Sequence, residues 1–218
     1  MKRWILLILG FLVLIGLGSV SAVECGSVPI DNCTVTQDTI FQNGIYHLPN
    51  GIKIGANNIT LNCNGSFLNG NKASNGISLS YKSGVKINNC NVYNYSNGIM
   101  LSSSSNNILV NNNVNSNVFG GIRLDSSSNN ILTDIITNSN LDGIYLYSSS
   151  NNNTLTNITA NSNYHGIYFW GSSNNQLANI IANLNTNHGV YLYSNSNNNT
   201  LTNITANSNS GTGTSGIY

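Results

Sequence analysis

The chain is built from one repeated unit. Six near-copies of 22 to 23 residues run from Gly76 to the end of the 218-residue chain. Each copy opens with Gly-Ile or Gly-Val, passes through Ser and Asn residues, continues with Leu-x-Asn/Asp-Ile or a close variant, and closes in a second Asn/Ser cluster. Self-similarity at this period is typical of a solenoid, in which each unit buries its apolar face by stacking on the next. The opening glycines are Gly76, Gly98, Gly121, Gly143, Gly166 and Gly189, and Gly216 begins a further copy.

The composition agrees with a folded solenoid and argues against one class of partner. The chain contains 45 Asn residues, and only 6% of its residues are charged. Evenly spaced Ile, Leu, Val and Tyr residues distinguish it from a disordered polar chain. The formal net charge is +1, and it becomes −1 if Lys2 and Arg3 are removed with a leader peptide. Because no basic face is available for phosphates, we do not expect nucleic-acid binding.

The N-terminus has the features of a signal peptide. Lys2 and Arg3 precede an apolar run over residues 4–17, and small residues before Val23 favour cleavage after Ala22. This run is shorter than the roughly 20 residues that span a bilayer, so an uncleaved anchor is the weaker interpretation. We predict a signal peptide over 1–22 and a secreted, cell-surface or periplasmic protein that has no membrane contact once the signal is removed.

Four cysteines follow the leader, and an exported chain can use them for disulfides. Cys25 and Cys33 lie close in sequence, where a bridge would fix a small N-terminal cap over 23–51. Cys63 and Cys90 occupy nearly matching repeat positions, and coils stacked about 4.8 Å apart would bring them within bonding distance. For this second pair, a disulfide and a column of buried thiols are both open. All four are candidates for structural roles, because a Cys-x-x-Cys metal motif is absent.

Within one repeat, apolar and other residues alternate with the period of a β-strand. In residues 143–147, Gly-Ile-Tyr-Leu-Tyr, the Ile and Leu side chains point one way and the two Tyr side chains the other. The Ser/Asn run that follows has turn chemistry, and a second short strand lies near Leu155. No stretch has helical periodicity. We predict an all-β fold, a single-chain parallel β-helix of about 22–23 residues per coil over 52–218, truncated within its last coil.

These repeats resemble those of a known class. The unit Gly-Ile-x-Leu-x-Ser-Ser-Ser-Asn-Asn-x-Leu-Thr-Asn/Asp-Ile is similar to the repeats of right-handed parallel β-helix proteins, especially the NosD-type region of many exported and archaeal cell-surface proteins. The resemblance covers residues 52–218, and Ile59-Thr-Leu-Asn-Cys-Asn-Gly resembles a first coil. It implies right-handed winding and a range of functions, because this fold serves polysaccharide lyases, hydrolases, adhesins and copper-site maturation proteins.

Residues one repeat apart are expected to stack into columns. Each buried Leu or Ile contributes roughly 1.5 to 3 kcal/mol, so a charge in the column of Leu146 should break the local winding. One Asn/Asp position per repeat should stack its side chains at a bend and satisfy polar backbone groups there. The expected inward columns are Ile77, Ile99, Ile122, Ile144, Ile167 and Val190; Leu79, Leu101, Leu124, Leu146, Phe169 and Leu192; and Leu109, Leu132, Leu155, Leu177 and Leu201. The expected bend column is Asn111, Asp134, Asn157, Asn179 and Asn203.

Outward positions of the first strand gather aromatic residues on three consecutive coils. The rings should form two columns, spaced about 4.8 Å between coils and about 7 Å along each strand. Aromatic faces with polar tips suit sugar rings, which present C–H surfaces and hydroxyls together. Stacking that stiffens the sheet, or a contact with another protein or domain, explains the same pattern. The candidate carbohydrate-binding residues are Tyr145, Tyr147, Tyr168, Trp170, Tyr191 and Tyr193, flanked by Arg123 and Asp125.

A possible metal site precedes three successive opening glycines. Asp142, His165 and His188 are each 23 residues apart. Two imidazoles and one carboxylate can hold a divalent metal, and the resemblance to NosD-type proteins makes copper the ion to consider. The outer pair would be about 10 Å apart at Cα, so solvated turn residues are the competing interpretation. We expect no other cofactor.

Catalytic chemistry has weaker support. Glycoside cleavage needs two carboxyl groups at a set separation, and no acidic residue follows Asp142. Arg123 and Asp125 are the only outward acid and base pair on the aromatic face, and the several acids of a Ca²⁺ cage are missing.

We therefore predict a non-catalytic structural or adhesive module at the cell surface that binds a polysaccharide or surface glycan. An accessory protein in copper handling and a fragment of a polysaccharide lyase or hydrolase are the alternatives. The last coil lacks a capping segment, which predicts self-association or attachment to further domains.

Overall fold

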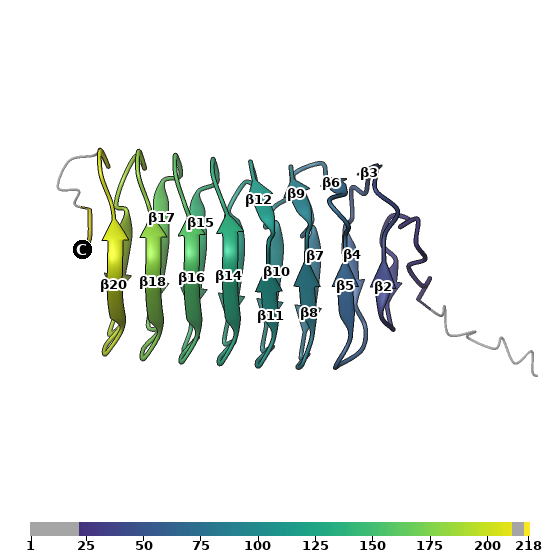
Figure 1. The fold of residues 1–218 in the computed structure, drawn as a ribbon, viewed down its shortest axis with the longest axis horizontal. Coiled ribbons are helices and arrows are strands. Elements are labelled where there is room, and N and C mark those ends of the chain that lie inside the picture. The colour runs from purple at the N-terminus through teal and green to yellow at the C-terminus, as the bar shows by residue number, and fades with distance from the viewer. Residues whose placement is uncertain (1–21, 211–215) are drawn as a thin grey trace, which may run out of the picture.

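The computed structural model describes residues 22–210 and 216–218. The chain winds as a row of stacked coils from the N-terminal end (purple) to the C-terminal end (yellow) in Figure 1. All pairings between the described strands are parallel. The predicted all-β parallel solenoid is therefore confirmed. The predicted signal peptide lies outside the described residues except for Ala22.

One sheet, which we call sheet A, takes a single strand from each coil. Its eight strands follow chain order, so each coil pairs with the next one. The segment 23–51 contributes β1 to this sheet and β2 and β3 to the other one, and it thereby extends both sheets. The strands of sheet A are β1 (Thr34–Val35), β4 (Ile52–Ile54), β7 (Ile77–Ser80), β10 (Ile99–Ser102), β13 (Gly120–Asp125), β15 (Asp142–Tyr147), β17 (His165–Trp170) and β19 (Val190–Tyr193).

The second sheet, sheet B, has twelve strands and divides at β14. Towards the C-terminus its strands are unbroken, whereas towards the N-terminus each coil contributes two short strands in two arms that both pair with β14. The unbroken strands are β14 (Ile131–Ile136), β16 (Thr154–Thr159), β18 (Gln176–Ile181) and β20 (Thr200–Thr205). The first arm is β2 (Thr39–Ile40), β5 (Thr60–Asn62), β8 (Lys86–Asn88) and β11 (Ile108–Val110). The second arm, at the top of Figure 1, is β3 (Ile45–His47), β6 (Phe67–Asn69), β9 (Asn91–Tyr93) and β12 (Asn113–Asn115).

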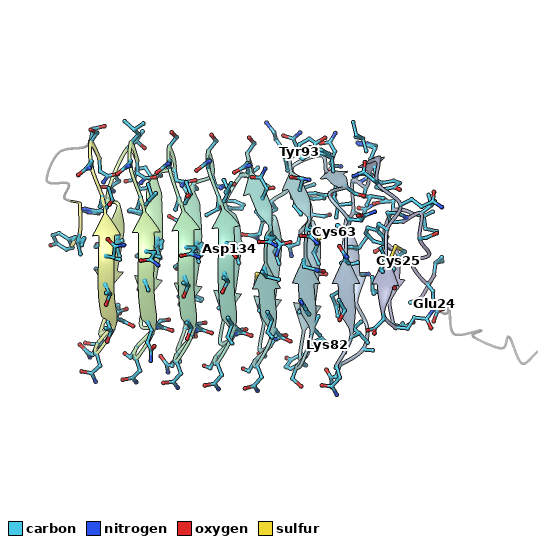
Figure 2. All side chains as sticks on the ribbon, in the orientation of Figure 1. Glu24, Cys25, Cys63, Lys82, Tyr93 and Asp134 are labelled. Carbon is cyan, nitrogen blue, oxygen red and sulfur yellow. A yellow bond between two sulfur atoms is a disulfide. The ribbon has the colours of Figure 1, made fainter. Side chains whose placement is uncertain are left out.

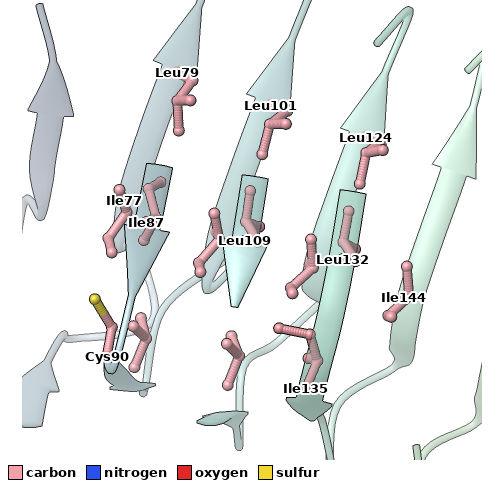
Figure 3. Packing of buried hydrophobic residues seen from close by; sticks show 14 of the residues in the cluster. Ile77, Leu79, Ile87, Cys90, Leu101, Leu109, Leu124, Leu132, Ile135 and Ile144 are labelled. Atoms are coloured by element: carbon pink, nitrogen blue, oxygen red, sulfur yellow. The ribbon is translucent and has the colours of Figure 1, made fainter. Parts of the chain in front are cut away.

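The core consists of the apolar columns that the repeat predicts. Leu146 pairs with Phe169 and Ile144 with Ile167 on the next coil, and all four side chains are fully buried. The columns that begin at Ile77 and Leu79 continue in the same way from coil to coil. Figure 3 shows Leu79, Leu101 and Leu124 on successive strands of sheet A. Leu192 and Leu201, in the last coils, are only partly buried. Stacked coils thus replace the single compact core of a globular domain.

Buried polar ladders run beside the apolar columns. In each step of the first ladder, the backbone N–H and the side-chain Nδ2 of one Asn donate to Oδ1 of the Asn on the next coil, as from Asn130 to Asn153 at 2.8 and 3.1 Å. These side chains are fully buried between the two sheets, so the ladder satisfies the turn backbone inside the solenoid. The first ladder is Asn107, Asn130, Asn153 and Asn175; the second is Asn117, Asn140, Asn163 and Asn185; and a Ser ladder is Ser104, Ser127, Ser150 and Ser172.

The predicted bend column is present and lies at the surface. Asn157 donates to Asp134 at 2.9 Å, and Asn179 donates to Asn157 at 3.1 Å. Its members, Asn111 and Asn203 included, have φ between 52° and 57°, the left-handed region that Asn and Asp tolerate. From Asp134 to Asn203 their side chains hydrogen-bond one another and not backbone groups. The expected role of satisfying polar backbone therefore falls to the buried ladders.

The four cysteines form two disulfides. Cys25 bonds to Cys33 across a separation of eight residues, near the N-terminal end of the solenoid. Cys63 bonds to Cys90 with their Cα atoms 4.8 Å apart, one coil spacing. The second bridge therefore joins two neighbouring coils. Figure 2 labels Cys25 and Cys63 in the N-terminal half of the solenoid. Among the described residues, no helix is long and apolar enough to cross a membrane.

Candidate functional site

The six aromatic residues singled out in the sequence lie together on the outer face of sheet A. They come from β15, β17 and β19, whose registers place each ring beside its counterpart on the next coil. The result is two columns with different ring geometry. We call Tyr145, Tyr168 and Tyr191 the inner column, and Tyr147, Trp170 and Tyr193 the outer column.

Rings of the inner column stack face to face. The centroids of Tyr145 and Tyr168 are 4.9 Å apart, those of Tyr168 and Tyr191 are 5.0 Å apart, and both pairs are 7° from parallel. Each ring therefore covers the face of the next one, and the solvent meets mainly ring edges. A sugar needs an open ring face, so this column is suited to stiffening the sheet.

Rings of the outer column are crossed. Trp170 lies 78° from the plane of Tyr147 and 83° from the plane of Tyr193, with centroids 6.0 and 5.2 Å apart. Crossed rings cover less of each other's faces than parallel rings do. Trp170 is 41% exposed and Tyr193 is 45% exposed, whereas Tyr147 and the inner column are half-buried. The accessible aromatic surface of the two columns is thus concentrated at Trp170 and Tyr193.

Arg123 closes the N-terminal end of both columns. Its register partner is Tyr145, and its guanidinium carbon lies 5.2 Å from the ring centroids of Tyr145 and Tyr147. An Arg over an aromatic face is attracted by the ring quadrupole. Arg123 Nη2 also lies 3.4 Å from Asp125 Oδ2, and both side chains are about a quarter exposed, so this pair adds little stability.

The tyrosines of the inner column resist ionisation. Burial, and then the neighbouring Tyr191 and Asp142, raise the pKa of Tyr168 to about 12. Burial and the neighbouring Tyr168 raise the pKa of Tyr145 further, against the opposing effect of Arg123. Burial and the neighbouring Tyr193 raise the pKa of Tyr191. The inner column is therefore a neutral surface at physiological pH, with phenol hydroxyls that both donate and accept hydrogen bonds.

Asp142 and His165 are brought together, and His188 stacks on His165. His165 Nδ1 lies 2.8 Å from Asp142 Oδ1, and Asn187 Nδ2 lies 3.2 Å from His165 Nε2. The two imidazoles are stacked 2° from parallel with centroids 5.9 Å apart.

Metal-binding lone pairs lie in the plane of an imidazole, so nearly parallel rings cannot direct them at one ion about 2.0 Å from both nitrogens. Over the part of the chain that the structure describes, no group of three or more His, Cys, Asp or Glu side chains could hold a metal ion. The competing interpretation, solvated turn residues, is wrong: all three side chains are buried, and Asp142 and His165 form a hydrogen-bonded polar pair.

Two aromatic residues extend the surface beyond the predicted set. The ring of Tyr218 lies 5.3 Å from Tyr191 and 5.0 Å from His188, and it follows Gly216 as Tyr191 follows Gly189, so the repeat contained this signal. Tyr164 lies edge-on against His165 at 4.5 Å and helps to bury it. Tyr164 belongs to a turn, where strand alternation makes no prediction.

Coils of parallel strands stacked into two sheets define a β-helix protein. A model of the right-handed β-helix region matches residues 15–134 and 111–218. The chain belongs to the right-handed β-helix family, which confirms the predicted handedness. No curated protein sequence matches it.

Solved structures of two carbohydrate-active proteins are similar to this chain. The periplasmic alginate epimerase AlgG has a TM-score of 0.65 and 25% identity, over 74% of this chain and 38% of the epimerase. The alginate lyase from Paenibacillus sp. str. FPU-7 has a TM-score of 0.61 and 16% identity, over 78% of this chain and 68% of the lyase. The lyase shares the fold alone. This chain spans well under half of the epimerase, so the similarity concerns the solenoid they share.

Proposed function

We propose that this chain is a non-catalytic β-helix module, exported or at the cell surface, that binds a polysaccharide or surface glycan on sheet A. The observation that carries the proposal is the outer column, in which Trp170 and Tyr193 expose aromatic surface on successive coils. The rigid inner column holds that surface in place, and the register of β17 and β19 sets the spacing. A linear glycan that runs along the solenoid axis meets one ring per coil, about every 4.8 Å.

The similarity to the alginate epimerase supports a carbohydrate-related β-helix. The epimerase that resembles this chain at 25% identity is described as periplasmic and acts on alginate, which favours an exported, carbohydrate-related role. The leader-like residues 1–22 favour export independently. The structural or adhesive part of the proposal follows from the repetitive stack, which presents one long rigid surface.

The acidic residues favour a binding module over an enzyme. Glycoside cleavage generally uses a pair of carboxyl groups that flank the bond. Here every carboxylate of the sequence already has a partner within the protein, most often on a neighbouring coil. The pairs are Glu24 with Thr36, Asp31 with Asn50, Asp38 with the backbone of Thr60, Asp125 with Arg123, Asp134 with Asn157, and Asp142 with His165.

Binding to a polysaccharide panel that includes alginate tests the proposal. Trp170→Ala and Tyr193→Ala should each weaken binding about tenfold, because each removes an aromatic contact of the order of 1 kcal/mol. Tyr81→Ala is the control, since Tyr81 is 80% exposed and lies outside both columns. Wild-type protein that binds no polysaccharide, or variants that bind as well as wild type, would contradict the platform. Release of new reducing ends or unsaturated products would contradict the non-catalytic assignment.

A further inference from the structure

A second candidate site lies on the second arm of sheet B, on different strands from the aromatic columns. It is a groove of about 390 Å³ over β3, β6, β9 and β12, at the lower end of the roughly 300–1,000 Å³ of small-molecule sites. The strands of this arm lie at the top of Figure 1, and Figure 2 labels Tyr93 there. Among the described residues, no charged side chain lines the groove.

The register places aromatic rings beside amides on the neighbouring coils. Phe67, Asn91 and Asn113 are partners on three successive coils, and Tyr93 is the partner of Asn115. The Phe67 and Tyr93 rings meet edge to face, with centroids 6.1 Å apart, and Phe67 is 44% exposed. The rings of Phe67 and Tyr93 therefore come from β6 and β9, and the amides continue the same two columns on β12.

Several polar groups in the groove keep unused hydrogen-bonding capacity. Asn91 Nδ2 donates to the carbonyl oxygens of Gly65 and Ser66, so its donors are used. Asn113 donates once, to Asn91, and Asn115 donates once, to Asn113, which leaves each amide one further N–H.

The same holds for two hydroxyls. Tyr93 Oη and Ser116 Oγ form no hydrogen bond with other groups in the described part of the chain. Together with the amides of Asn113 and Asn115, they offer four polar contacts beside the two aromatic rings.

We propose that this groove binds one or two rings of a neutral saccharide. The apolar face of a sugar ring suits Phe67 and Tyr93, and its hydroxyls suit the free N–H and O–H groups in the groove. A uronate or phosphate would lose its hydration here without meeting a counter-charge, so the uncharged lining selects against it. This inference does not depend on the sheet A proposal, because the two sites share no residue.

Titration of the full folded chain with a neutral panel tests it. The probes are cello-, malto-, manno- and xylo-oligosaccharides, with alginate oligosaccharides as the charged comparison, followed by calorimetry and saturation-transfer NMR. Phe67→Ala and Tyr93→Ala should weaken binding of the neutral ligand about tenfold. Tyr93→Phe keeps the ring and loses only the hydroxyl, so it should lose less. If an alanine variant fails to fold, the binding affinity of Tyr93→Phe still tests the site.

Tyr81→Ala is the control and should leave this binding unchanged, because Tyr81 is 80% exposed and lies outside both the groove and the aromatic columns. Loss of binding in Trp170→Ala but not in Phe67→Ala would overturn this inference while supporting the sheet A site. A wild-type protein that binds none of the neutral probes, or that prefers alginate oligosaccharides in this groove, would overturn it as well. Neutral binding that only Phe67→Ala and Tyr93→Ala weaken would support it even if the outer column binds nothing.

Discussion

At the scale of single residues, the Asn-rich composition reflects the interior as well as the turns. Asn153 is fully buried, accepts from the backbone and side chain of Asn130, and donates to Ser127 O and Asn175 Oδ1 at 3.1 Å. Its carboxamide has the size and the paired donor and acceptor groups to link three successive coils. A buried polar group is stable only when such bonds are made.

Replacing Asn153 should therefore be costly. Asn153→Ala leaves the Asn130 backbone N–H without an acceptor, and we expect the free energy of unfolding to fall by about 2 kcal/mol or more. Urea denaturation measures this change. Asn197→Ala is the control, because Asn197 is exposed and its side chain makes no hydrogen bond with the described residues. It should change stability by less than about 0.5 kcal/mol. Equal effects of the two substitutions would contradict a structural ladder.

At the scale of the strand, the opening glycine of each repeat is required by close packing between coils. A Cβ on Gly166 would lie less than 3.0 Å from Gly189 O and from Ala182 Cβ, a distance that real Cβ atoms do not show. The other opening glycines meet the carbonyl of the next opening glycine in the same way. Only a residue without a side chain lets successive coils approach at this corner.

Gly166→Ala should force neighbouring coils apart. We expect a loss of about 1–3 kcal/mol in the free energy of unfolding, as for overpacking in a core. The change is measured by denaturation, with Gly26→Ala as the matched control, because a Cβ at Gly26 would meet no atom within 4 Å. A Gly166→Ala protein as stable as the Gly26→Ala protein would refute the packing argument.

The stacked tyrosines of sheet A predict a dependence of stability on alkaline pH. The pKa of Tyr168 is about 12 in the folded protein and about 10 in an unfolded chain. Between these values the unfolded state releases its proton first, so stability is full below pH 10 and falls as the pH rises towards 12. Tyr168→Phe keeps the ring and removes the titrating group. Its free energy of unfolding should fall less steeply from pH 10 upwards in urea titrations, and identical slopes would contradict burial of the hydroxyl.

At the scale of the whole molecule, the coils are interchangeable units. Asp142 and His165 are register partners, so deletion of residues 143–165 joins one coil to the next in the same register. We expect the shortened chain to fold with the same β-sheet circular dichroism per residue and to be shorter by about 4.8 Å in X-ray scattering.

Deletion of part of a coil is the control. Removal of residues 143–154 deletes nearly all of β15, so β13 and β17 lose the strand that pairs with both of them in sheet A, and their backbone groups are left without partners there. This protein should aggregate or lose cooperative unfolding. A partial deletion that folds as well as the whole-coil deletion would show that strand pairing in sheet A does not hold the solenoid together.

Much of the architecture was predictable from local spacing. Strand alternation placed Ile144 inside and Tyr145 outside, and the period of the repeat made Leu146 a neighbour of Phe169, which the pairing of β15 and β17 confirms. The repeat also predicted that six aromatic residues share one face. Such predictions succeed because both periods, two residues along a strand and 22 to 23 between coils, are set by backbone geometry.

Spacing alone did not determine ring orientation, burial of polar groups or bonding between neighbours. The sequence by itself made Tyr168 and Trp170 outward residues of one coil, but only the tertiary structure made one column parallel and the other crossed, because ring angles depend on all neighbours at once. The tertiary structure likewise buried Asn153, joined Cys63 to Cys90, and paired His165 with Asp142. Repetition determines which residues meet, whereas packing in three dimensions decides what they do when they meet.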